Sequence, residues 1–265
     1  MLELKDLQKT FAPGTVNEHT ALENIDFTLN DGDFATVLGS NGAGKSTLFG
    51  AIAGTFWPDA GHVLLDGEDI TYLPEYRRAR KIGILFQDPL KGTAPDMTIA
   101  ENLALAYTHG RRFPLARALT RRDTEEMRQK LAAFGMGLED RMKMKVGLLS
   151  GGQRQAMTLL MATVAQPRLL LLDEHTAALD PATAEKVLAI TVQIVREQKV
   201  PTMMITHNMA SALKLGNRTI MMEQGEIILD IAGEERGRMQ VDDLLKRYAG
   251  KQGKQLDNDR MLLSR

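Results

Sequence analysis

Apolar side chains recur along the chain with regular spacings, and these spacings predict its strands. Residues 2–7 and 22–29 alternate apolar and polar side chains, which is typical of half-buried strands, and we expect them to form an antiparallel pair. FATVLG at 34–39 and RLLLLDE at 168–174 are almost unbroken apolar runs, as in strands that are buried on both faces. Similar patterns predict further strands in HVLLDG, IGILFQ and PTMMITH.

Helical spacing occurs between these strands. Residues 46–54 show it and end at a glycine, and residues 96–165 keep it over most of their length, beginning with a Thr98–Glu101 capping box. Another helix is expected from Pro181, because proline fits the first helical position. RTIMMEQGEIILDI predicts a closing hairpin. Strands that alternate with helices indicate a mainly parallel sheet, so we expect an α/β fold with one helical insertion.

The composition is that of a soluble globular protein with a large core. Of the 265 residues, 43% are hydrophobic and 25% are charged, and the formal net charge is −1. This balance gives no global field that would attract nucleic acid or an anionic membrane. There are no cysteines, which excludes disulfides and thiolate chemistry. Neither a signal peptide nor a membrane-spanning apolar run is present, so we expect any membrane contact to go through a partner.

GSNGAGKST, residues 39–47, is a candidate phosphate-binding loop (P-loop). It matches G-x-x-x-x-G-K-[ST] and lies between a predicted strand and a predicted helix, the context that this motif requires. Its glycines let backbone amides surround phosphate oxygens, Lys45 offers a positive charge to the β- and γ-phosphates, and Ser46 offers a hydroxyl to Mg²⁺. A chance match is expected in on the order of 1% of chains this long, so we favour this interpretation over a plain glycine-rich turn.

Polar side chains follow three predicted strands, at the sheet edge where α/β proteins bind ligands. Asp173 and Glu174 end a buried strand; the first suits a Mg²⁺ ligand, and the second can take a proton from an attacking water. Gln87 closes IGILFQ, and His207 closes PTMMITH. Taken alone, any one of these polar residues is more often a solvated strand end. Together they follow a P-loop in the order that is typical of nucleotide hydrolases.

LLSGGQRQ, residues 148–155, precedes a predicted helix and allows two interpretations. Ser150 followed by Gln153 fits a capping box, in which each side chain satisfies an orphan amide at the helix start. A glycine-flanked helix N-terminus is also an anion site. Both interpretations can hold at once.

In this order, the motifs resemble the nucleotide-binding subunit of an ATP-binding-cassette (ABC) transporter. The resemblance rests on the P-loop, Gln87, LSGGQ, LLLLDE, the AALD of residues 177–180 and His207. It implies a P-loop NTPase (RecA-like) core with a small antiparallel β subdomain and an inserted helical subdomain. The implied bounds are 1–249 for the ABC ATPase domain, about 1–88 and 166–231 for the core, about 89–165 for the helical subdomain, and 250–265 for a polar tail.

The resemblance also implies an ATPase that uses Mg²⁺ and works as a head-to-tail dimer, each ATP lying between one chain's P-loop and the other chain's LSGGQ. It assigns Glu174 as general base, His207 as γ-phosphate switch, and Gln87 as the link between nucleotide, Mg²⁺ and membrane partner. The implied ATP contacts are Phe11, Gly39, Ser40, Asn41, Gly42, Ala43, Gly44, Lys45, Ser46, Thr47, Ser150, Gly151, Gly152, Gln153 and Asp180. The implied Mg²⁺ ligands are Ser46, Gln87 and Asp173. Phe11 would stack on adenine, or pack at a sheet edge; Asp180 would make contact across the dimer.

The implied partners are a second copy of the chain, membrane permease subunits and, indirectly, a substrate-binding protein, with no nucleic acid. The permease, received by residues 88–103, would hold the chain at the cytoplasmic face of the membrane. DEHTAALD, with His175 where the family commonly has proline, and GTAPDMTIAENL resemble importers of amino acids such as tryptophan or tyrosine. The alternative is a soluble ABC ATPase of translation or DNA repair, although the single P-loop and the lack of heptads disfavour it. A P-loop kinase would leave LSGGQ and His207 unexplained.

Overall fold

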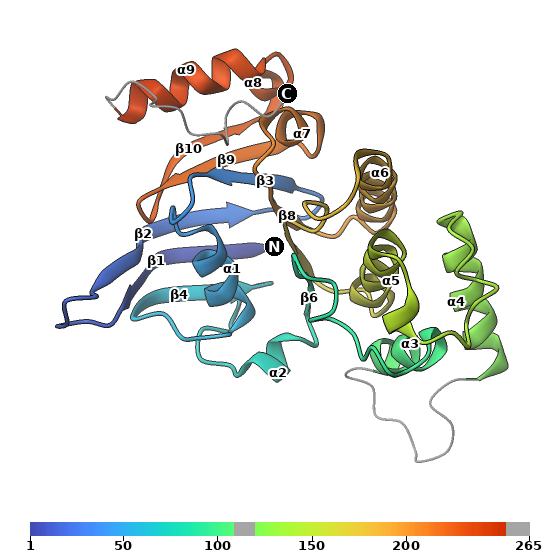
Figure 1. Cartoon of the computed structure of the whole chain (residues 1–265). Helices are drawn as coiled ribbons and strands as arrows, with labels where there is room; N and C mark the ends of the chain where they lie inside the picture. The colour runs from blue at the N-terminus through green and yellow to red at the C-terminus, as the bar shows by residue number, and fades with distance from the viewer. Residues whose placement is uncertain (109–119, 253–265) are drawn as a thin grey trace. The chain divides into compact units, whose positions relative to one another are not determined.

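The computed structural model describes residues 1–108 and 120–252, which form two compact units (Figure 1). The first unit comprises Met1–Ala79 and Lys199–Arg265, and the second unit comprises Arg80–Gln198. The predicted tail lies outside the described residues from residue 253 onward, whereas residues 250–252 end a helix. The division into a P-loop core and a helical subdomain stays a prediction.

An antiparallel sheet forms part of the first unit. Its strand β1 (Leu2–Phe11) pairs with β2 (His19–Leu29) on one side and with β4 (Ala60–Leu65) on the other, and β5 (Glu68–Asp69) extends the sheet beyond β4. The predicted antiparallel pair is confirmed, and both strands are longer than predicted. The burial alternation of β1 slips at Asp6, whose φ of +47° accompanies a register shift, as at a β-bulge.

A second set of strands in the first unit is mainly parallel. β3 (Phe34–Gly39) lies between β8 (Thr202–Ile205) and β9 (Arg218–Glu223) and runs parallel to both, and β10 (Glu226–Ala232) pairs antiparallel with β9. All six residues of β3 are buried, as its unbroken apolar run predicts. Gln224 and Gly225 both have positive φ between β9 and β10, which confirms the closing hairpin.

Helices follow the strands of the first unit. α1 (Lys45–Ala53) begins after β3 and ends at Gly54, which is left-handed. The others are α2 (Glu75–Arg78), α7 (Met209–Lys214), α8 (Gly233–Gly237) and α9 (Val241–Gln252). In Figure 1, α8 and α9 lie beside the β9–β10 hairpin. The sequence pattern had not led us to expect α9.

The second unit combines two parallel strands with several helices. β6 (Ile82–Leu85) pairs with β7 (Leu169–Asp173). The helices are α3 (Ile99–Thr108), α4 (Arg121–Ala133), the 3-10 turn η1 (Val146–Leu148), α5 (Gly151–Val164) and α6 (Pro181–Gln198). α5 packs against α3, α4, α6 and β6, and the Thr98–Glu101 capping box opens α3 as predicted. No helix within the described ranges is both long and apolar enough to cross a membrane.

Candidate functional site

The strand–loop–helix predicted for residues 39–47 is present in the first unit. Two of its glycines approach neighbouring backbone too closely for any side chain. Gly39 has a φ of +150°, and a Cβ there would lie 2.3 Å from the carbonyl oxygen of Met222. Gly44 has a φ of +99°, and a Cβ there would lie 2.4 Å from the carbonyl oxygen of Ala21. Glycine at both positions therefore fixes the loop tightly against β2 and β9.

Lys45 is buried within this loop, with 6% of its surface exposed. Its ammonium group donates hydrogen bonds to the carbonyl oxygens of Gly39 (2.8 Å) and Ser40 (2.7 Å). Ser46, in the first turn of α1, is exposed, as is Asn41 in the loop. The loop thus holds a cation at the N-terminus of a helix, the combination that binds phosphate.

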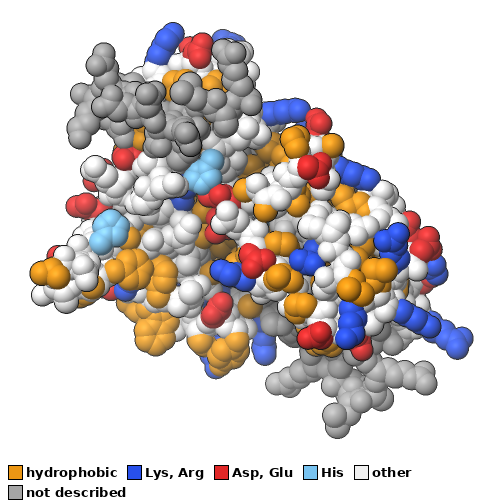
Figure 2. All heavy atoms as spheres, in the orientation of Figure 1, with side chains coloured by type: hydrophobic (Ala, Val, Ile, Leu, Met, Phe, Trp, Pro, Cys, Tyr) orange, Lys and Arg blue, Asp and Glu red, His pale blue; other side chains and the backbone are white. Residues whose placement is uncertain are grey.

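Phe11 ends β1 and is 39% exposed. Its ring meets the edge of Phe56 with centroids 5.4 Å apart, and the Lys9 ammonium lies 5.5 Å from its centroid. Asp59 fixes this end of the strand, because it accepts hydrogen bonds from Lys9 (2.8 Å) and from the Thr10 amide (2.7 Å). Figure 2 shows hydrophobic side chains over this part of the first unit. Phe11 therefore packs at the sheet edge and also presents a supported aromatic surface, so both interpretations stay open.

His207 lies at the same edge of the first unit's parallel strands as the P-loop. Val37 of β3 is in register with Ile205 of β8, and the Thr206 amide donates to the Val37 carbonyl oxygen at 3.2 Å. Gly39 lies two residues after Val37, and His207 lies two residues after Ile205. The structure thus brings His207 and the start of the P-loop to one edge, as predicted from the ends of their strands.

The second unit places its candidate residues at one strand edge of its own. Leu85 of β6 is in register with Leu172 of β7, so Gln87 and the pair Asp173–Glu174 follow adjacent strand ends. Gln87 is exposed, and both carboxylates are half-buried. Glu174 has a φ of +44°, in the left-handed region that residues with side chains rarely adopt. Other non-glycine residues, such as Asp6 and Gln224, share this conformation, so it marks the turn after β7 and does not by itself identify a base.

Ser150 caps α5, also in the second unit. Its hydroxyl accepts from the Gln153 amide at 3.3 Å, and the Gln153 side-chain oxygen accepts from the Ser150 amide at 3.2 Å. This confirms the capping box. Gln153 also donates to the Met136 carbonyl oxygen at 3.2 Å, so its side chain has a structural role. Ser150 remains exposed at the helix N-terminus, so the capping box leaves room for an anion.

The two glycines of LSGGQ differ in their surroundings. Gly152 is buried, and a Cβ there would lie 2.1 Å from the Thr183 methyl group of α6. Gly151 is exposed, and its Cβ would make an ordinary 3.4 Å contact with Leu179. Close packing of α5 on α6 thus suffices to explain Gly152, whereas packing does not explain Gly151.

Asp180 caps α6. It accepts a hydrogen bond from the Thr183 amide at 3.1 Å, and hydrogen bonding by the Thr183 side chain and backbone lowers the pKa of Asp180. The side chain is exposed and ionised at neutral pH. This hydrogen bond lies within one chain, so the contact of Asp180 across a dimer stays a prediction.

A family profile described as "ABC transporter" matches residues 22–177, more than half of the chain. The chain belongs to the ABC transporter family. The tyrosine transport ATP-binding protein of Clostridioides difficile is 42% identical to it over 248 residues, which cover 94% of this chain and 98% of that protein. The methionine import ATP-binding protein MetN 2 of Enterococcus faecalis is 36% identical over 231 residues, which cover 86% of this chain and 64% of that protein.

The fold of this ABC ATPase has solved relatives. A dimeric ATP-binding cassette in a post-hydrolysis state, bound to ADP and Pi, matches it with a TM-score of 0.71 and 29% identity, covering 88% of this chain and 98% of the other. The predicted α/β P-loop NTPase fold is confirmed. The chain is an ATP-binding and ATP-hydrolysing subunit of an ABC transporter, and the soluble alternative finds no support.

His175 directly follows the candidate base Glu174 in this ABC ATPase. The ring is 2% exposed, and burial lowers its pKa to about 4, so it is neutral at pH 7. Its Nε2 lies 3.2 Å from the Thr191 hydroxyl oxygen, and that hydroxyl donates to the Val187 carbonyl oxygen at 2.9 Å. The neutral ring therefore carries its proton on Nε2 and donates to Thr191, which ties the turn after Glu174 to α6. No sequence motif marks Thr191, so this contact was not predicted.

Proposed function

We propose that this ABC ATPase binds ATP with residues 39–47. It hydrolyses ATP with residues that follow the ends of its parallel strands, among them Glu174 and His207. Lys45 neutralises the β- and γ-phosphates, Phe11 stacks on adenine, and His207 contacts the γ-phosphate. Glu174 accepts the proton of the attacking water. The buried Lys45 ammonium at the head of α1 supports the phosphate assignment most directly.

Mg²⁺ is the metal that fits the candidate ligands. Ser46 offers a hydroxyl, Asp173 a carboxylate and Gln87 an amide oxygen, and all three are the hard oxygen donors that Mg²⁺ prefers. Mg²⁺ uses few protein ligands when it also binds substrate phosphates. The ion would neutralise charge on the phosphate oxygens.

A second copy of the chain completes the proposed site. Ser150, Gly151, Gly152 and Gln153 of one copy contact the ATP held by the P-loop of the other, and Asp180 makes contact across this head-to-tail dimer. The exposed hydroxyl of Ser150 and the exposed Gly151 support this role, because both present a helix N-terminus that can accept an anion. The related cassette solved as a dimer gives further support.

The transport step is proposed to be import of an aromatic amino acid such as tyrosine. The observation that carries this is the 42% identity to a tyrosine transport ATP-binding protein, over 98% of that protein's length. The chain would associate with permease subunits through residues 88–103, at the cytoplasmic face of the membrane. A substrate-binding protein would deliver the amino acid to that permease.

Replacing Lys45 by alanine tests the proposal. We expect folded Lys45→Ala protein to lose retention of a fluorescent ATP analogue, and cells whose transporter carries it to lose uptake of labelled tyrosine. Lys130→Ala is the control, because the side chain of this lysine is 42% exposed and pairs with Glu126 on its own helix face. Normal retention of the analogue by Lys45→Ala protein would contradict the assignment of residues 39–47 as the ATP site. Uptake of labelled methionine but not of tyrosine by the unaltered transporter would contradict the substrate.

A further inference from the structure

Glu223 joins the C-terminal helix α9 to the P-loop within the first unit. It is the last residue of β9, and its neighbour Met222 is in register with Gly39. The Ser40 hydroxyl donates to Oε2 of Glu223 at 2.9 Å, and the Tyr248 hydroxyl donates to the same oxygen at 2.6 Å. One carboxylate oxygen thus accepts from the nucleotide-binding loop and from α9.

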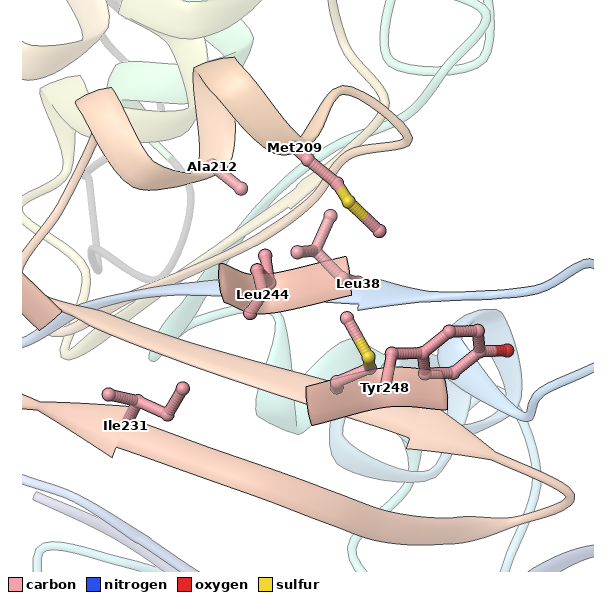
Figure 3. Packing of buried hydrophobic residues seen from close by; sticks show 7 residues of the cluster. Leu38, Met209, Ala212, Ile231, Leu244 and Tyr248 are labelled. Carbon is pink, nitrogen blue, oxygen red and sulfur yellow. The ribbon is translucent and has the colours of Figure 1, made fainter. Parts of the chain in front are cut away.

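Packing places the Tyr248 ring independently of its hydroxyl. The residue is 6% exposed and belongs to an apolar cluster with Leu38, Met209 and Leu244. Figure 3 shows its hydroxyl pointing away from the labelled apolar side chains. Leu38 is the residue before Gly39, so the cluster lies directly behind the start of the P-loop. A buried tyrosine of this kind combines an apolar body with a hydroxyl that needs a partner.

Ser40 connects Glu223 to Lys45. Its hydroxyl is bound to Glu223, while its carbonyl oxygen accepts from the Lys45 ammonium at 2.7 Å. We propose that Tyr248 is a positioning residue for ATP binding: through Glu223 it holds Ser40, and Ser40 in turn holds Lys45. Tyr248 itself contacts no phosphate. The inference rests on the proposed role of Lys45, and it makes α9 part of the nucleotide-binding machinery.

Removing the Tyr248 hydroxyl alone tests this connection. Tyr248→Phe keeps the ring and its packing but leaves Glu223 with one donor fewer, and hydrogen bonds to a carboxylate are among the strong ones. We expect KM for ATP to rise about threefold to tenfold. We expect kcat to stay within about twofold, because the general base Glu174 is not part of this chain of contacts. A purely structural role for Tyr248 would change stability without this separation of KM from kcat.

The experiment uses the full chain with Tyr248→Phe, Ser40→Ala and both together. If the three residues act as one unit, each single variant raises KM by a similar factor and the double variant raises it no further. Tyr76→Phe is the control, because this tyrosine of the same unit is exposed. An unchanged KM in Tyr248→Phe, or a double variant whose effect is the product of the single effects, would overturn the inference. Failure of the proposed function is recognised separately, by Lys45→Ala protein that still binds ATP.

Discussion

The buried His175 ring makes a pH-dependent contribution to stability. Burial lowers its pKa from 6.5 to about 4 in the folded chain. Between these pH values the unfolded chain takes up a proton that the folded chain does not. This protonation stabilises the unfolded state. The contribution is therefore complete above pH 6.5 and is lost progressively as pH falls toward 4. We expect this residue to lower the free energy of unfolding by about 2 kcal/mol between pH 7.5 and pH 5.

Urea unfolding of His175→Gln protein at both pH values measures this contribution. Glutamine is neutral throughout, so the variant is expected to be less stable at pH 7.5 but to lose less stability on acidification. His19→Gln is the control, because His19 is exposed. Equal losses in the unaltered and His175→Gln chains would show that His175 does not titrate in this way.

The residues proposed to carry the chemistry are marked by motifs in the sequence, whereas the residues that contact and position their neighbours are not. Lys45 lies in a motif, and Glu174 stands at the end of an unmistakable apolar run. Thr191 and Tyr248 are ordinary polar residues in helices, and their partners lie 16 and 25 positions away. Only the packing of α6 and α9 brings such pairs together.

At the scale of elements, the head of α5 serves as a cap and is proposed to bind phosphate as well. Ser150→Asp separates these roles, because aspartate caps a helix as well as serine does but places a negative charge where a phosphate would lie. We expect an unchanged melting temperature and ATP turnover reduced at least about tenfold. Thr120→Asp is the control, because Thr120 caps α4 in the same way and is not among the proposed ATP contacts. Normal ATP turnover by stable Ser150→Asp protein would show that Ser150 caps the helix and does not bind phosphate.

Strands and helix boundaries were predictable where local signals were strong. Unbroken apolar runs predicted β3 and β7, and glycine at the left-handed position ends α1 as expected. α9 was missed although Val241, Leu244, Leu245 and Tyr248 follow helical spacing in the sequence. The structure shows that this apolar face packs in the cluster that contains Leu38. The shift of register in β1 was missed because a bulge at Asp6 depends on pairing with β2.

At the scale of the whole molecule, the loop after Gln87 is the proposed contact with the permease. Leu90 in this loop is 41% exposed, which suits an apolar contact with a partner. The chain has no cysteine, so a single Leu90→Cys substitution gives a unique thiol. We expect it to crosslink to a permease subunit in membranes that contain the assembled transporter. Val16→Cys, fully exposed in the β1–β2 hairpin, should not crosslink, and equal labelling of both positions would argue against a specific contact.

The proposed ATPase needs a second copy of the chain, so one substitution can test chemistry and assembly together. Glu174→Gln keeps the shape of the side chain but removes the base, which typically costs 10²–10⁴-fold in rate. ATP binding is expected to survive, because Lys45 and the P-loop are unchanged. Each unhydrolysed ATP would then keep joining one chain's P-loop to the other chain's Ser150 helix.

The most direct measurement is light scattering after gel filtration of Glu174→Gln protein, with and without ATP and Mg²⁺. We predict a monomer without ATP and a dimer with it, together with the loss of hydrolysis. Adding Ser150→Asp to the same chain should abolish the dimer while each P-loop still binds ATP. A Glu174→Gln chain that stays monomeric with ATP bound, or that hydrolyses ATP at the normal rate, would contradict the account.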